Sequence, residues 1–174
     1  ISWSSSHSAE HAFGRVIVAA LDKDAKRLRS SLSELKSLRD YKDYLGIEPE
    51  ILILAFPMDV AFLAELPASL VLEMGEVLLR TQRANFAPTD DILSSFEEAI
   101  GGPSFQLKTL KLRDALYKGR IKEAASLLSD VKAGLSDAEF LTYKGWLAFL
   151  RGEESLAIEG FDQAGKKLRK RGYL

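Results

Sequence analysis

The chain has 174 residues, of which 47% are apolar and 28% charged, and its 24 lysines and arginines nearly balance 25 aspartates and glutamates. The net charge of -1 excludes an overall attraction to nucleic acid or anionic membrane, and the lack of cysteine excludes disulfides, thiol catalysis and cysteine-ligated zinc. No apolar run approaches the roughly 18 residues of a membrane-spanning helix. We therefore expect a soluble, cytoplasmic protein with no membrane partner, long enough for one domain or a short repeat array.

The serine-rich start, ISWSSSHS, lacks the basic residues and the long apolar core of a signal peptide. We expect residues 1–7 to be disordered or foreign to the natural protein, and residues 8–174 to form a single α-helical repeat domain. Because the first residue is isoleucine and not methionine, we also expect the chain to be a fragment of a larger multidomain protein.

The stretch HSAEH, residues 7–11, matches the H-x-x-E-H signature, in which two histidines hold zinc and the glutamate acts as a base. The chain has only these two histidines, whereas an enzyme of that kind needs a third ligand and a large surrounding domain. A polar helix start is therefore the favoured interpretation. Because no nucleophile–histidine–acid set or phosphate-binding loop can be assembled either, we predict no enzyme activity, catalytic residue, metal or cofactor.

In the first half of the chain, two helices are predicted at residues 8–21 and 22–46. Apolar residues recur in the second of these at intervals of three or four, which is typical of one buried helix face, and Gly46 is expected to end it. This apolar stripe consists of Ala25, Leu28, Leu32, Leu35 and Leu38.

Residues 49–66 contain an eight-residue apolar run that fits either a buried strand or a buried helix. Because no second strand candidate is present to pair with it, short helices broken at Pro57 are predicted. A helical hairpin is predicted at residues 67–102. Residues 46–79 contain six acidic residues and no lysine or arginine, which favours a buried layer and leaves a homo-oligomer surface as the alternative.

Glycine residues divide the second half into two predicted helical hairpins, each with a glycine at its turn. The hairpins are residues 103–134, with the turn at Gly119, and residues 136–171, with the turn at Gly152. Ser136 lies three residues before Glu139, which is the spacing of a capping box at a helix N-terminus.

The two hairpins share a sequence pattern. The segments ALYKGRIKEAASLL, residues 115–128, and AFLRGEESLAIEGF, residues 148–161, place alanine, glycine and apolar residues in register at a spacing of 33. A fixed period near this value is typical of stacked helical hairpins, because one amphipathic hairpin cannot bury its apolar stripe alone.

Small residues are predicted to bring the helices of the second hairpin close together, with Phe161 filling the space left by Gly145 between Ala157 and Ala164. The same four residues match the glycine of the first helix and the Ala-x3-Phe-x2-Ala pattern of the second helix in the tetratricopeptide repeat (TPR) family. Over about residues 105–171 the chain therefore resembles that family, in a degenerate form.

This resemblance implies an all-α fold, a right-handed array of antiparallel helical hairpins, and the function of a protein–protein interaction scaffold that binds another protein or a peptide. In that family the first helices of successive repeats line a concave groove. By position, the partner-binding candidates are Thr109, Arg113, Leu116, Thr142, Trp146 and Phe149. Trp146 is the leading anchor if it lies in the groove, but a place in the core is an equally good interpretation.

A basic stretch ends the last predicted helix. It consists of Lys166, Lys167, Arg169, Lys170 and Arg171. Cations at a helix C-terminus suit the helix dipole, and this interpretation is favoured over contact with phosphates. If the basic stretch contacts phosphates instead, this supports the alternative function. That function is a regulatory helical domain of a bacterial-type transcription regulator or of a nucleic-acid-dependent ATPase, which contacts nucleic acid through this helix.

Overall fold

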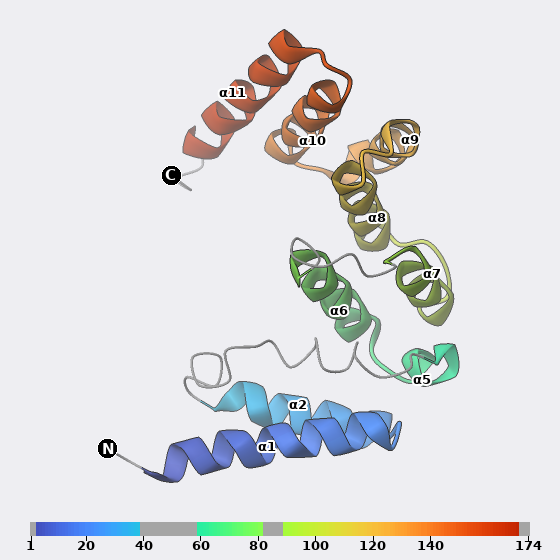
Figure 1. Cartoon of the computed structure of the whole chain (residues 1–174), viewed down its shortest axis with the longest axis vertical. Helices are drawn as coiled ribbons and strands as arrows, with labels where there is room; N and C mark the ends of the chain where they lie inside the picture. Colours follow the sequence, from blue (N-terminus) through green and yellow to red (C-terminus); the bar gives the residue numbers. More distant parts are fainter. Residues whose placement is uncertain (1–2, 39–58, 82–88, 171–174) are drawn as a thin grey trace. The chain divides into compact units, whose positions relative to one another are not determined.

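The computed structural model describes residues 3–38, 59–81 and 89–170, which form nine α-helices, one short 3-10 helix and no β-strand (Figure 1). The predicted all-α fold is therefore confirmed over this part of the chain. None of its helices has the length and apolar content that crossing a bilayer requires. The chain divides into two compact units, Ile1–Gly102 and Pro103–Leu174, and a single repeat domain over residues 8–174 stays a prediction.

The first unit opens with two helices packed side by side, α1 (Trp3–Leu21) and α2 (Ala25–Ser37). Residues 3–7 lie within α1, whereas the sequence predicts that residues 1–7 are disordered or foreign to the natural protein; of these two alternatives, disorder is not what the structure has at residues 3–7. The physical reason is that extending an existing helix through polar serines is inexpensive once an apolar segment has nucleated it.

The apolar stripe of α2 faces inward as predicted, except at its last position. Its buried members are Ala25, Leu28, Leu32 and Leu35. Leu38 is the C-cap and has an extended backbone, so α2 ends at Ser37 and not at Gly46. Residues 39–46 lie outside the described residues.

Three further helices belong to the described part of the first unit. They are α5 (Val60–Ala64), α6 (Ala68–Thr81) and α7 (Thr89–Ala99), and α7 packs on the other two. No large apolar side chain of residues 59–79 is strongly exposed, which favours the buried-layer interpretation for this stretch. Residues 46–58, including the predicted break at Pro57, lie outside the described residues, and a homo-oligomer through 46–79 stays a prediction.

The side chain of Asp59 caps α5 and links it to the turn between α1 and α2. Its carboxylate accepts a hydrogen bond from Lys23 Nζ at 3.0 Å and from the backbone N–H groups of Ala61 and Phe62 at 2.8 and 3.4 Å. The Lys23 bond first, and then the two N–H groups, hold the pKa of Asp59 below its ordinary value of 3.8. Lys23 itself takes the left-handed backbone conformation, with φ of 52°.

The second unit consists of two helical hairpins, as predicted. The first hairpin pairs α8 (Phe105–Tyr117) with α9 (Ile121–Val131), which continues into the 3-10 helix η1 (Lys132–Gly134). The second pairs α10 (Asp137–Leu150) with α11 (Glu154–Lys170), side by side in Figure 1. Helix α10 also packs on α8 and α9, so the two hairpins are stacked.

Local signals in the sequence fix the ends of these helices. Gly119 and Gly152 occupy the turns with φ of 66° and 76°, the left-handed region that glycine enters at no steric cost. The predicted capping box is present, since the N–H of Ser136 donates to the Glu139 carboxylate at 2.9 Å and the N–H of Glu139 donates to the Ser136 hydroxyl at 3.3 Å. Both hairpins therefore begin and turn where the sequence predicts.

Candidate functional site

Helices α10 and α11 approach so closely at one point that backbone touches backbone. A Cβ atom added to Gly160 would lie 2.9 Å from Gly145 Cα and 3.2 Å from the carbonyl oxygen of Leu141. A Cβ on Gly145 would lie 3.2 Å from the carbonyl oxygen of Ala157 and 3.3 Å from two ring carbons of Phe161. The predicted packing of Phe161 against Gly145 is thus confirmed, and Gly160 completes the contact.

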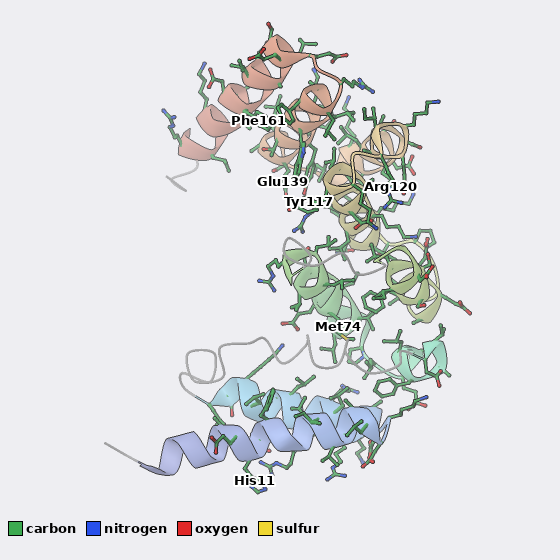
Figure 2. The ribbon with its side chains drawn as sticks, in the orientation of Figure 1. His11, Met74, Tyr117, Arg120, Glu139 and Phe161 are labelled. Carbon is green, nitrogen blue, oxygen red and sulfur yellow. The ribbon has the colours of Figure 1, made fainter. Side chains whose placement is uncertain are left out.

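Four large apolar side chains of this hairpin are exposed to solvent. They are Phe149, 65% exposed, Ile158, 57%, Phe161, 44%, and Leu168, 37%, and we call them the end surface. Ile158, Phe161 and Leu168 are spaced by three and seven residues, so they share one face of α11. Phe149 lies one turn after Gly145 on α10, and Figure 2 labels Phe161 where α11 lies against α10.

The same hairpin also carries a shallow hollow of about 110 Å³, smaller than the roughly 300–1,000 Å³ of small-molecule pockets. Lys144, Ala148 and Arg151 of α10 and Leu156 and Gly160 of α11 are among the residues that line it. No member of the end surface lines this hollow, so the hollow and the end surface are separate features of the hairpin.

The first hairpin carries an equivalent of the end surface, but there it is covered. At the spacing of 33 residues, the counterparts of Phe149, Ile158, Phe161 and Leu168 are Leu116, Ala125, Leu128 and Leu135. Leu116 and Leu128 are buried in the core cluster of the unit, and Ala125 and Leu135 pack against that cluster half-buried.

Helix α10 provides the cover. Leu147 is buried in the same cluster, and other apolar side chains of α10 pack against it. These are Phe140, Tyr143, Trp146 and Leu150. The end surface of the second hairpin has no such cover within the described residues, since no further helix follows α11 there.

Trp146 packs against the core cluster and also contacts Tyr117, at the end of α8. Its ring is half-buried against the core cluster and meets Tyr117 edge-to-face, with centroids 4.9 Å apart and planes at 79°. The indole thus packs on α8 with one part and remains accessible with another, and its place in a partner-binding groove stays a prediction.

Of the other five predicted groove residues, only Phe149 is strongly exposed. Leu116 is buried, so its assignment to a partner-binding groove is wrong: α10 covers that position. Arg113, Thr109 and Thr142 are half-buried, and both threonine hydroxyls donate to carbonyls of their own helices, at 2.9 and 2.8 Å. Phe149 is thus the most exposed of the six candidates, and a partner-binding role for the five that are not buried stays a prediction.

A buried carboxylate that the sequence reasoning missed lies at the turn of the first hairpin. Asp114 is 1% exposed and forms ion pairs with Lys118 Nζ, at 3.0 Å, and with the guanidinium of Arg120, which also pairs with Glu123 at 3.2 Å. Figure 2 labels Arg120 at this turn. The signal that could have found Asp114 is the 33-residue register, because its counterpart in the second hairpin is Leu147.

The basic stretch of α11 is only partly described. Lys166, Lys167 and Arg169 are exposed, and Lys167 Nζ donates to the Asp137 carboxylate of α10 at 2.8 Å. The side chain of Lys170, and Arg171 altogether, lie outside the described residues. Lys167 therefore helps to hold α11 on α10, while Lys166 and Arg169 project from the last turns of the helix.

The histidine motif brings no metal site together in the described part of the chain, where no three histidine, aspartate or glutamate side chains cluster. His11 is exposed on α1 (Figure 2), and the side chain of His7 lies outside the described residues.

The chain was compared with models of known protein families, with curated protein sequences and with solved structures, and none of them matched.

Proposed function

We propose that this protein is a protein–protein interaction scaffold of the TPR-like class, which binds another polypeptide through the end surface. The observation that carries the proposal is the exposure of Phe149, Ile158, Phe161 and Leu168, whose counterparts on the first hairpin are covered by α10.

The energetics of apolar exposure support this proposal. Two phenylalanines, an isoleucine and a leucine gathered on one side of a helical hairpin form a patch, whereas single exposed apolar residues are ordinary on a soluble protein. Each square ångström of apolar surface removed from water contributes about 25 cal/mol, and large side chains at the centre of an interface supply most of its binding energy. A partner that covers these four side chains gains most of its affinity from them.

The test is selection of binders from a display library of random 16-residue peptides, with the full 174-residue chain as bait. We expect Phe149→Asp to weaken binding of the selected peptides by at least about tenfold, since a charge in an apolar contact is strongly unfavourable. Leu156→Asp is the matched control, because Leu156 is 53% exposed on α11 but lines the hollow and is not part of the end surface. Equal weakening by both changes, or the absence of any binder, contradicts the proposed function.

The charge of the second unit favours one alternative. Residues 103–174 carry 14 lysines and arginines against 9 aspartates and glutamates, a net charge of +5, whereas residues 1–102 carry 10 against 16, a net charge of -6. This asymmetry supports contact of α11 with nucleic acid, as in the regulatory-domain reading. Binding of a 20-nucleotide single strand that weakens with salt and is lost in Lys166→Gln/Arg169→Gln would establish it; salt-independent or unchanged binding excludes it.

A further inference from the structure

We infer that the end surface receives a single amphipathic helix, with a basic flank, which lies on α10 and α11 as α10 lies on α8 and α9. This inference rests on the proposed function and specifies the class of partner. It follows from continuity with the interface between the hairpins, because the covered surface and the end surface are made of residues in the same register.

The covering helix α10 shows what such an occupant looks like. Its apolar side chains on the first hairpin recur at intervals of three and four residues, which places them on one helix face. This covering stripe is Phe140, Tyr143, Leu147 and Leu150, with Trp146 at its edge. A helix with apolar residues at i, i+3, i+7 and i+10 therefore has the pattern that fits the seam.

The framework beneath the two surfaces is the same, but the surfaces differ in bulk. Buried alanines recur in register, at Ala115 and Ala148 and at Ala124 and Ala157. Above them, Leu116 is replaced by Phe149, Ala125 by Ile158 and Leu128 by Phe161. Because the surface is larger at three positions, the occupant needs smaller side chains than Phe140 and Tyr143, the two aromatic residues of the covering stripe.

Two carboxylates at the edge of the end surface define the charge of the partner. Glu154 and Asp162 lie four residues before and after Ile158 on α11, so the three side chains form one row, and the exposed Lys166 continues this row four residues later. Both are exposed, and neither carboxylate forms an ion pair or a side-chain hydrogen bond with another described residue. Their counterparts on the first hairpin are Ile121 and Ser129, which carry no charge.

The acidic part of the row, from Glu154 to Asp162, selects cations on the flank of the arriving helix that lies over it, although Lys166 and the unit as a whole are positive. Charges separated by more than the Debye length of about 8 Å at physiological salt are largely screened, so the carboxylates in direct reach of the partner decide. Salt bridges of this kind at the rim of an interface contribute mainly to specificity and to the rate of association.

The experiment uses a second display library, on an 18-residue helical frame of alanine, glutamate and lysine, in which four positions spaced as 140, 143, 147 and 150 are randomised. With the full chain as bait, we expect alanine, valine and leucine to be selected at these positions, and the circular dichroism of a selected peptide to gain helix on binding. Phe149→Asp should weaken binding at least about tenfold and Leu156→Asp by less than about twofold.

The flank is tested with Glu154→Gln/Asp162→Asn, which should weaken binding of lysine-flanked peptides about two- to fivefold at low salt and have no effect at high salt. Random-library binders that depend on Phe149 but stay extended overturn the helix inference and leave the proposed function intact. Sedimentation that reveals a dimer of the chain lost in Phe149→Asp also overturns it, since the occupant is then a second copy. Failure of both libraries overturns both proposals.

Discussion

The two hairpins of the second unit have the same helical arrangement, but one is covered by a further helix and the other is exposed within the described residues. In the first, α8 and α9 place Leu116 and Leu128 under α10, where both are buried. In the second, α10 and α11 place Phe149 and Phe161 at the same register positions, where both are exposed. The backbone arrangement alone therefore does not decide whether such a position is core or surface; the neighbour that follows it does.

The comparison also shows what changes where the cover is absent. The residues that hold each hairpin together are small and buried in both cases, such as Ala124 and Ala157. The residues above them become larger, and carboxylates appear at the rim, at Glu154 and Asp162. A covered surface and an exposed surface can thus share a framework and differ only in their outer layer.

The largest expected effect is on the free energy of unfolding, when the side chains at the equivalent positions Leu116 and Phe149 are each shortened to alanine. We expect Leu116→Ala to lower the free energy of unfolding by about 2–5 kcal/mol, because it leaves a cavity in the core cluster. Phe149→Ala should change it by less than about 1 kcal/mol, since most of that side chain is already in water. Urea denaturation of the two variants measures both values, and equal losses would break the comparison between covered and open positions.

The second prediction concerns Asp114, which occupies the register position that Leu147 occupies in the second hairpin. We expect Asp114→Ala to cost about 1–3 kcal/mol, because it removes the buried partner of Lys118 and Arg120, whose charges are themselves one-third exposed. Asp114→Leu, which copies Leu147, should be less damaging than alanine because an apolar side chain fills the site. A leucine variant less stable than the alanine variant refutes this equivalence.

The close contact between α10 and α11 offers a matched pair of glycines on one helix. A Cβ on Gly160 meets backbone at 2.9 Å, so Gly160→Ala should destabilise by about 1–2 kcal/mol despite the better helix propensity of alanine. Gly165 has nothing within 4 Å of its Cβ position, and Gly165→Ala should stabilise by up to about 1 kcal/mol. Thermal melts of both variants give the signs. Stabilisation by both would show that helix propensity outweighs the backbone contact, and destabilisation by both would contradict the open space at Gly165.

The smallest expected effect lies in the first unit and serves as the background for the other three. The pKa of Asp59 is held below 3.8 in the folded protein, so its contribution to stability is present above about pH 4 and is lost as the pH falls through the folded pKa. The difference in the free energy of unfolding between the wild type and Asp59→Asn should therefore become smaller as the pH is lowered from 5 through the folded pKa. Urea denaturation at each pH measures this difference. A constant difference over this range argues against the Lys23 bond, and altered peptide binding argues against independent units.

Local signals made much of the fold predictable. The capping box at Ser136 and the turn glycines at Gly119 and Gly152 act within a few residues, so the sequence contains all the information they need. The contact of Phe161 with Gly145 was predictable for a related reason, since small and large residues on paired helices must complement each other.

The burial of individual side chains could not be predicted in the same way, because it depends on which helix packs over them. Leu116 and Phe149 look equivalent in sequence, and only the position of α10 makes one core and the other surface. Asp114 looked like one of many carboxylates, because the burial that distinguishes it comes from packing and not from its own segment. The end of α2 at Ser37 was missed because the amphipathic pattern continues beyond it while the backbone of Leu38 turns to an extended conformation.

The stacking order has a consequence for how the protein is made. Each helix of the second unit packs on helices that adjoin it or lie one element further along, so the contacts close only short stretches of chain and favour rapid folding. During translation, α8 and α9 leave the ribosome before α10. The apolar surface of α8 and α9 therefore stays exposed until α10 has been translated. The nascent chain thus passes through a state in which Leu116 and Leu128 are as exposed as Phe149 and Phe161 are in the folded helices described here. A protein that binds the end surface can therefore also bind the growing chain for a short time.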